Sequence, residues 1–593
     1  MVTSESEMLG ATIPSNVMHT LLLLAFLLFV HVSLLVPGYA FVKRSSLFSG
    51  RLSVELCAGY LLTLFVMAAT TTLGYVLALP QYFLQIVLVG FVVLGACLFI
   101  RERYYPDIIK LRFPLLCLLL MSGMSLLFTQ LSLQQPYRII PDPQPIAGSL
   151  YDSFDVKILN IAQTNANDNS IPYRQAQFIN NRSDPARDSF IDEWGVTFFQ
   201  RTPLMGAVAA AYYTMLGAKL PIGYIWNADS AGFQGTYLQF QALSSALNAL
   251  FIIPAYFLLR RLFGKKTSVL SLLFLVPSHY FIFNAFFSWP KSLVAFFVLL
   301  SWWLILEKRF RYLILAAVAS GMAYLTHDLA LLYLGASILL LVLMRRFKDT
   351  AIYLGITAIF MAPWLIVSSI IYKKPSTFIY YPLSIHGIPQ YDDRHRIAQE
   401  FLHTSPLKLI YIRLQSLVYL LSPYQLFTSE GGQTISNRLW GLGIFSIPGS
   451  VTLGVMTASI IGLIKRRSLR LWALCIIPVI ACVVVIGWPY GLGAIHFAEA
   501  VVVILTGVGV WFLQKLANKA FLLLAFSIEV LQLIFFTVFC YSFQWRNWFG
   551  NIHDMVVLAF LLAIVAFCGV MIWALSTNNP LARKRFGWIA GTA

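Results

Sequence analysis

The chain alternates long apolar runs with short polar segments, and many of the runs approach the length of a membrane-crossing helix. Such a helix needs about 20 predominantly apolar residues. The pattern predicts fifteen spans, near residues 18–37, 55–79, 82–100, 113–131, 236–259, 267–284, 291–306, 312–327, 329–344, 350–371, 439–464, 471–488, 497–514, 520–541 and 554–575. We therefore expect an all-α polytopic membrane protein.

Composition supports a membrane protein. Of the 593 residues, 59% are hydrophobic and only 11% are charged, against about 25% charged in a typical soluble domain. The mean hydropathy is +0.76. The first apolar run, Met18 to Pro37, lacks a preceding basic region and is followed by Lys43 and Arg44 instead of a small-residue cleavage site, so we interpret it as a retained span and not as a signal peptide.

The basic residues predict the orientation of the chain. Most of the 42 Lys and Arg residues lie in alternate short connections, for example those that follow residues 100, 259, 306, 344 and 464. Cytoplasmic loops carry such an excess of Lys and Arg. The N terminus is therefore expected outside and the C terminus in the cytoplasm. The net charge of +18 is explained by this signal and by attraction to anionic membrane lipids, and nucleic acid is not expected as a partner.

Two long polar segments divide the sequence into five regions. We expect four N-terminal spans in 1–131, a first extracytoplasmic loop with juxtamembrane helices in 132–235, a transmembrane core in 236–371, a second extracytoplasmic loop in 372–438 and C-terminal spans with a short tail in 439–593. Because the polar residues gather at one membrane face, the pattern favours a surface active site over a conduit, where they would gather near the midplane.

The first extracytoplasmic loop contains an aspartate pair in the stretch SLYDSFDVKILNIAQTN, residues 149 to 165. Apolar residues at helical spacing follow Asp152, so Asp152 and Asp155 are expected at one helix end near the lipid surface. A carboxylate there can act as a general base. The alternative is structural, because Asp152 as N-cap with Asp155 at N3 is close to a capping box.

The second extracytoplasmic loop carries basic residues on the face where the orientation rule disfavours them. Lys373, Lys374, Arg394 and Arg396 lie there among tyrosines and histidines. Such residues suit a phosphate at the lipid surface, although any one of them can equally be an ordinary solvated charge. An acidic loop and a basic loop together suit a hydroxyl acceptor, which needs a base, and a phosphate leaving group, which needs cations.

A soluble nucleotide-binding domain is not indicated. The chain has no P-loop and no GxGxxG that follows a strand pattern. A donor carried on a lipid explains both features.

Five stretches in order resemble the GT-C glycosyltransferases related to protein O-mannosyltransferases and lipid A aminoarabinose transferases. They are RTPLMGAVAAAYYTMLGAKL (201–220), FQALSSALNALFIIPAYFLLRRLFGKK (240–266), NAFFSWPKSLVAFFVLLSWWLIL (284–306), GMAYLTHDLALLYLGASILLLVLMRR (321–346) and MAPWLI (361–366). Later, WPYGLGAIHFAEAVVVILTG (488–507) resembles the family's arginine-tyrosine span start. The similarity covers roughly residues 140 to 515.

The resemblance implies a GT-C-like bundle and a hexosyl- or pentosyltransferase. This enzyme would move a sugar, with inversion, from a polyprenyl-phosphate donor to a lipid, glycan or protein acceptor on the outer face. The family's loop acid falls on Asp152 or Asp155, and the reserve candidates are Asp192 and Glu193. His496 stands where the family has an arginine, and we include it among the predicted donor-phosphate contacts although neutral histidine binds anions less well.

Three further residues are singled out by their polarity within apolar sequence. His327 and Asp328 replace part of a Leu-Thr-Lys element of the family and form either a metal or proton-handling pair or a hydrogen-bonded pair that stabilises a short loop. Glu499, three residues after His496, is placed to orient it. No cofactor is implied with certainty, and a divalent cation stays open.

Two other functions remain open at this point. A transporter or flippase of lipid-linked saccharides would also be polytopic and basic. An O-antigen ligase or polymerase would also use outer loops.

Overall fold

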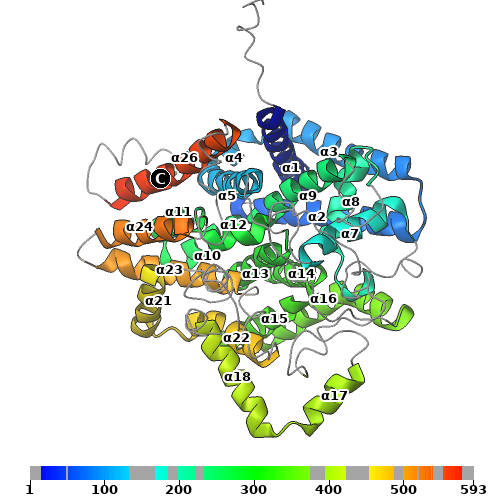
Figure 1. The fold of residues 1–593 in the computed structure, drawn as a ribbon. Helices are drawn as coiled ribbons and strands as arrows, with labels where there is room; N and C mark the ends of the chain where they lie inside the picture. Colours follow the sequence, from blue (N-terminus) through cyan, green and yellow to red (C-terminus); the bar gives the residue numbers. More distant parts are fainter. Residues whose placement is uncertain are drawn as a thin grey trace, which may run out of the picture.

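The computed structural model is all-α over the residues that it describes. These are residues 15–48, 51–131, 167–183, 198–220, 231–286, 288–373, 383, 394–421, 453–485, 498–516, 520–535, 537 and 552–576. Within these ranges there is no β-strand. The expected fold class is therefore confirmed at this level, and Figure 1 shows the helices gathered into one bundle.

The N-terminal region forms four long helices and one short one. They are α1 (Ser15–Ser45), α2 (Leu52–Val76), α3 (Gln81–Arg101), the short α4 (Tyr105–Lys110) and α5 (Arg112–Gln130). Their buried apolar side chains belong to the same hydrophobic core as those of the later helices. These helices are thus part of the bundle and not a separate layer (Figure 1).

The segment after α5 contributes three elements to the bundle: α7 (Asn167–Asn181), the 3-10 turn η1 (Phe198–Gln200) and α8 (Leu204–Met215). All twelve residues of α8 are buried. The Thr71 hydroxyl of α2 donates to the Ala207 carbonyl over 2.9 Å, and the Tyr212 hydroxyl lies 2.7 Å from the Ser33 hydroxyl of α1. Helix α8, which follows Pro203 and lies in the region where juxtamembrane helices were expected, is therefore held by α1 and α2.

The central helices contain the longest buried stretches of the chain. They are α9 (Ala231–Ala249), α10 (Ile252–Phe263), α11 (Lys265–Leu275), α12 (His279–Phe286), α13 (Lys291–Leu306), α14 (Phe310–Thr326), η2 (Asp328–Ala330), α15 (Leu331–Leu343), α16 (Phe347–Leu365) and the π-helical turn η3 (Ile366–Ile371). Every residue of α13 is buried, whereas α16 buries only three. The core of the molecule thus lies around α13, and α16 lies at the periphery.

The C-terminal part adds seven more described helices. They are α17 (Arg394–His403), α18 (Pro406–Leu421), α21 (Leu453–Arg466), α22 (Leu469–Val485), α23 (Glu499–Lys515), α24 (Ala520–Phe535) and α26 (Ile552–Ser576). In Figure 1, α17 and α18 extend away from the remaining helices at the bottom of the view.

Seven helices among the described residues are long and apolar enough to cross a membrane, which supports a multi-pass membrane protein. The pair α11 and α12, bent by 61°, would make an eighth span. Helices also occupy the remaining predicted positions, but those helices are shorter. The count of fifteen spans therefore stays a prediction.

The first helix is longer than its apolar run indicates. We expected a span that ends at Pro37, but α1 continues to Ser45 with Pro37 inside it. Proline interrupts helical hydrogen bonding, and neighbouring side chains can satisfy backbone groups at such a site. Here the Gly38 N–H donates to the Thr63 hydroxyl of α2 over 3.1 Å.

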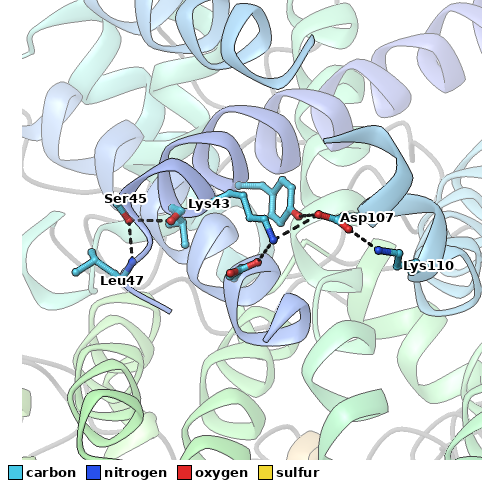
Figure 2. A network of polar contacts seen from close by, with 8 residues as sticks. Lys43, Ser45, Leu47, Asp107 and Lys110 are labelled. Carbon is cyan, nitrogen blue, oxygen red and sulfur yellow. Dashed lines mark hydrogen bonds and ion pairs between the residues drawn. The ribbon is translucent and has the colours of Figure 1, made fainter. Parts of the chain in front are cut away.

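Charged residues join the N-terminal helices at one end of the bundle. The Lys43 ammonium of α1 lies 2.8 Å from the Glu55 carboxylate and 3.4 Å from that of Asp107. Lys110 lies 2.7 Å from the other oxygen of Asp107, as Figure 2 shows. Asp107 therefore sits between two lysines, and the pairs of Lys43 with Glu55 and Asp107 tie α1, α2 and α4 together.

The same end of the bundle connects these helices with the central and C-terminal ones. Glu307 after α13 pairs with Arg51 and lies 3.9 Å from Arg261. Arg311 donates to the Leu47 carbonyl, Arg346 to that of Ile305, and Arg466 to that of Leu262, over 2.9, 2.9 and 2.6 Å. We call this end the basic face; it comprises Lys43, Arg51, Lys110, Arg261, Arg311, Arg346 and Arg466.

Candidate functional site

The ends of three central helices define the opposite side of the bundle. Helix α13 ends and α14 begins at the basic face, and α23 ends there because Gln514 hydrogen-bonds to Thr267 at the start of α11. The start of α13, the end of α14 and the start of α23 therefore lie at the far end. These three points carry the polar residues that form the candidate site.

His327 and Asp328 occupy the break between α14 and α15. His327 leaves the helix with φ −159° and ψ 132°, which ends α14 and directs the ring towards Asp328. Its Nδ1 lies 2.9 Å from the Asp328 carboxylate and 3.2 Å from the Leu329 backbone N–H. These contacts require different protonation states of Nδ1. We assign Nδ1–H donating to Asp328, because the contact is shorter and a carboxylate is the stronger acceptor.

Lys291 is a buried cation at the first residue of α13. Its residue exposure is 7%, and its ammonium nitrogen lies 3.5 Å from the centre of the Trp289 ring. The Asn248 side chain of α9 accepts the Leu293 N–H over 3.1 Å and so fixes this helix end. Lys291 interacts electrostatically with both His327 and Glu499.

Glu499 is the first residue of α23 and is 1% exposed. A carboxylate is stabilised at a helix N-terminus by the unpaired backbone N–H groups and the helix dipole. Tyr280 of α12 and Tyr333 of α15 both interact electrostatically with this carboxylate. Within the described chain its Oε1 atom has no hydrogen-bond partner.

Arg201 supplies a second cation from the segment before α8. It interacts electrostatically with His327, and its carbonyl accepts a 3.2 Å hydrogen bond from the Gln175 side chain of α7. The neighbouring Phe199 stacks on Tyr372 with ring centroids 3.7 Å apart. Lys373 follows Tyr372, so its backbone lies close to this stacked pair. Its backbone has a positive φ of 53°.

These residues form one mixed-charge group that we call the outer cluster: Arg201, Lys291, His327, Asp328 and Glu499. Burying charges is costly unless they are paired; here Lys291 and Arg201 act electrostatically on His327, and Lys291 also acts on Glu499. The carboxylates and the imidazole can accept or donate protons, and the cations can neutralise a phosphate. Within the described residues, His, Cys, Asp and Glu nowhere gather in threes as a metal site would require.

The sequence-predicted site residues are described only in part. Residues Asp152, Asp155, Asp192, Glu193, Lys374 and His496 lie outside the described residues. Arg394 and Arg396 begin α17, and only their backbone is described. The structure pairs His327 with Asp328, and it connects His327 with Glu499 only through Lys291, which acts electrostatically on both. Whether Glu499 orients His496 stays a prediction.

Sequence reasoning missed Lys291 and Arg201, although both carried a signal. Lys291 directly follows a proline in SWPK, and Arg201 stands two residues before one in QRTP; each begins an apolar stretch on the side predicted to be extracytoplasmic, where basic residues are disfavoured. We applied that argument to the second loop but not to these two positions. Trp289, the aromatic partner of Lys291, has no such signal, because aromatic residues are frequent throughout the chain.

Comparison of the chain with family models, curated proteins and solved structures finds no match. The resemblance to GT-C glycosyltransferases therefore rests on the order of the sequence stretches quoted above. A function has to be argued from the chemistry of the outer cluster and from its place in the bundle.

Proposed function

We propose that the chain is an integral membrane glycosyltransferase of the GT-C type, with fifteen spans. It transfers a sugar, with inversion, from a polyprenyl-phosphate donor to a lipid, glycan or protein acceptor at the extracytoplasmic face. The N terminus is outside and the C terminus is cytoplasmic. The observation that carries this proposal is the outer cluster, in which the buried Lys291 and the partly buried Arg201 lie near buried acids at the end of the bundle opposite the basic face.

The orientation follows from the two ends of the bundle. Basic residues accumulate on the cytoplasmic side of membrane proteins, so the basic face is assigned to the cytoplasm. The outer cluster then lies at the extracytoplasmic surface, where a lipid-linked donor presents its phosphate beside the membrane.

The proposed reaction is a single displacement. A carboxylate takes the proton of the acceptor hydroxyl, and the acceptor oxygen attacks the anomeric carbon of the sugar from the side opposite the phosphate. The bond between that carbon and the phosphate oxygen breaks, and its electron pair stays on the phosphate. Cations positioned at the developing charge stabilise the transition state.

Each group of residues has a role in this scheme. Asp152 or Asp155 remains the proposed base, with Asp192 and Glu193 in reserve. Lys291 and Arg201 join Lys373, Lys374, Arg394, Arg396 and His496 as donor-phosphate contacts. Asp328 holds the His327 ring by a hydrogen bond, and Glu499 holds Lys291, because an opposite charge nearby helps to keep a buried cation charged.

The experiment uses the purified full-length protein in liposomes. Prenyl-phosphate-linked hexose and pentose donors are supplied with a cell-envelope extract as acceptor, and both free prenyl phosphate and new glycosidic bonds are measured. We expect Lys291→Met to lower transfer by about 100-fold, as the loss of one transition-state cation does, and Lys291→Arg to retain part of it. Arg44→Gln, at an exposed pair on the basic side, is the matched control and should transfer normally.

Separate variants test the base. Asp152→Asn or Asp155→Asn should abolish transfer while donor binding is unchanged. If both transfer normally, neither is the base. If no donor is consumed by the wild-type protein, the enzyme proposal is wrong.

Glu529 favours the second candidate, a transporter or flippase of lipid-linked saccharides. It is a carboxylate within α24 that is 4% exposed, and its Oε1 has no hydrogen-bond partner within the described chain. Intramembrane acids often mark transport pathways. Movement of a prenyl-linked sugar across vesicles, without release of prenyl phosphate and without a new bond, would establish this candidate. Consumption of oligosaccharide donors alone would indicate a ligase or polymerase.

A further inference from the structure

The turn between α10 and α11, at Gly264, is the place where the ends of α21 and α23 meet the central helices. Arg466, the last residue of α21, donates to the Leu262 carbonyl before this turn over 2.6 Å. The Gln514 side-chain amide of α23 donates to the Thr267 hydroxyl after the turn over 3.2 Å. Two C-terminal helices are therefore held against one turn at the basic face.

Helices α21 and α23 lie side by side (Figure 1). The Ser459 hydroxyl of α21 donates to the Leu505 carbonyl of α23 over 2.6 Å. A Cβ added to Gly509 of α23 would lie 2.5 Å from the Val455 carbonyl oxygen of α21. Because the two backbones approach so closely, the cations at the ends of these helices are fixed relative to each other.

Two of these cations share one aromatic ring. The guanidinium carbon of Arg466 lies 4.9 Å from the centre of the Trp511 ring and 4.6 Å from that of Phe263. The Lys515 ammonium lies 4.3 Å from the centre of the Trp511 ring. The ring attracts each cation, whereas the cations repel each other. The rings therefore gather positive charge at this point.

Arg260 adds a third cation from the last turn of α10. Its side chain hydrogen-bonds to Tyr256 in the same helix and interacts electrostatically with Lys265, which begins α11. A Cβ added to Gly264 between them would meet nothing within 4 Å, so the surface beside the turn is open. We call Arg260, Lys265, Arg466 and Lys515 the turn cluster.

Acids neutralise other cations on this side of the bundle but not these. Five acids pair with lysines or arginines elsewhere: Glu55, Glu102, Asp107, Glu307 and Asp349. Among the described residues, none forms an ion pair with Arg260, Arg466 or Lys515. The turn cluster is therefore complementary to an anion.

The surface next to the turn cluster is apolar. Ile460 and Ile464, six and two residues before Arg466, are 49% and 58% exposed. In a membrane protein such side chains contact lipid chains, and tryptophans such as Trp511 are frequent at the boundary between membrane and water. A ligand that meets both the cations and these isoleucines needs an anionic head and apolar chains.

We propose that the turn cluster binds the phosphate of an anionic phospholipid of the cytoplasmic leaflet, whose acyl chains lie along the exposed isoleucines of α21. Basic sites between membrane helices on the cytoplasmic side hold such head groups. The phosphate neutralises cations from α10, α11, α21 and α23 at once, so it joins the C-terminal helices to the central ones. This site is separate from the outer cluster and takes no part in sugar transfer.

Equilibrium binding of dioleoylphosphatidylglycerol to the delipidated full-length protein in detergent, followed by native mass spectrometry, tests the site. The test variant combines Arg260→Gln with Lys515→Gln, both at exposed positions, and leaves the Arg466 contacts in place. We expect it to bind this lipid about 30-fold more weakly, about 5-fold for each cation removed. The matched control combines Arg345→Gln with Lys348→Gln, two exposed cations at the start of α16, and should bind as the wild type does.

Two further ligands separate a phospholipid from other anions. Dioleoylphosphatidylcholine, which has no net charge, should bind the wild type at least about 10-fold more weakly. Glycerol phosphate, which has the phosphate without the chains, should not compete. Equal loss in the two double variants would show diffuse attraction to the whole face and overturn the proposal. Equal binding of both lipids, or competition by glycerol phosphate, would overturn it as well.

Thermal unfolding in detergent supplies a second readout. A ligand that binds only the folded protein raises the unfolding midpoint. Dioleoylphosphatidylglycerol should therefore raise the midpoint of the wild type and of the Arg345→Gln, Lys348→Gln control, but not that of the Arg260→Gln, Lys515→Gln variant. The same rise in all three proteins would contradict binding at the turn cluster.

Discussion

Lys291 and Glu499 are ionisable side chains that the fold takes out of water at the ends of two different helices. Each is costly to bury alone, and removing one partner of such a group leaves the other charge uncompensated. The sequence indicated Glu499 because a carboxylate within an apolar stretch is conspicuous. It did not indicate that Lys291 compensates it, because the two residues are brought together only by the packing of α13 and α23.

A double-mutant cycle measures this compensation. We expect Lys291→Met combined with Glu499→Gln to destabilise less than the two single changes add up to, with a coupling of about 1 kcal/mol or more. The free energy of unfolding in detergent is the measurement. Lys291→Met with Glu529→Gln is the control and should be additive within about 0.5 kcal/mol, since burial is the only influence identified on Glu529. Additivity in both pairs would contradict the outer cluster.

Asp107 gives a prediction about pH. The hydrogen bond from Lys110, together with Lys43, holds the pKa of the Asp107 carboxyl below its usual value. Its contribution to stability is therefore fully present above the unfolded pKa of about 3.9 and is lost as the pH falls through the lower folded pKa.

Replacing Asp107 removes that contribution. Asp107→Asn should destabilise the protein by about 0.5–1 kcal/mol at pH 7, and the difference from wild type should shrink below about pH 4. Thermal unfolding at both pH values checks this. Glu102→Gln, at a more exposed pair with Arg44, should show a smaller difference at pH 7, and a constant difference for Asp107→Asn at all pH values would contradict the assignment.

At the scale of elements, close approach of backbones decides where the N-terminal helices cross. A Cβ added to Gly59 of α2 would lie 2.6 Å from the Tyr39 backbone nitrogen of α1, and one added to Gly38 would lie 1.9 Å from the Gly59 carbonyl oxygen. Small residues at such crossings allow membrane helices to pack closely. The same contact explains why α1 continues through Pro37, because α2 supports the interrupted turn.

Substitution of these glycines tests the crossing. Gly59→Ala should destabilise the protein by about 1–3 kcal/mol through overpacking. Gly90→Ala in α3 is the control, since a Cβ there meets nothing within 4 Å, and it should be neutral or slightly stabilising. Thermal unfolding of both proteins in detergent gives the comparison, and equal midpoints would show that α1 and α2 do not approach so closely.

At the scale of the whole molecule, the bundle has two chemically different ends. Arginines and lysines from distant parts of the chain meet at the basic face, and the outer cluster lies at the other end of α13, α14 and α23. The alternation of basic connections along the sequence predicted this division. It follows from the requirement that successive spans cross the bundle in opposite directions.

Cysteine labelling tests the assignment of the two ends to compartments. In intact cells, a membrane-impermeant maleimide should label Lys373→Cys, beside the outer cluster. It should label Lys348→Cys, at the start of α16, only after the membrane is opened. The unsubstituted protein controls for the exposed native Cys97. The reverse pattern would invert the proposed orientation, and with it the extracytoplasmic site.

Hydropathy and helical propensity act over stretches of a few to twenty residues. The amino-acid pattern alone was therefore enough to predict a membrane environment, an all-α fold and the approximate positions of the helices. It also singled out His327, Asp328 and Glu499, because polarity within an apolar stretch is a local signal. The packing of the helices brings His327 near Lys291 and Arg201, and Glu499 near Lys291. Such meetings depend on how each helix is rotated and tilted against helices distant in sequence, and that is set by side-chain packing over the whole bundle.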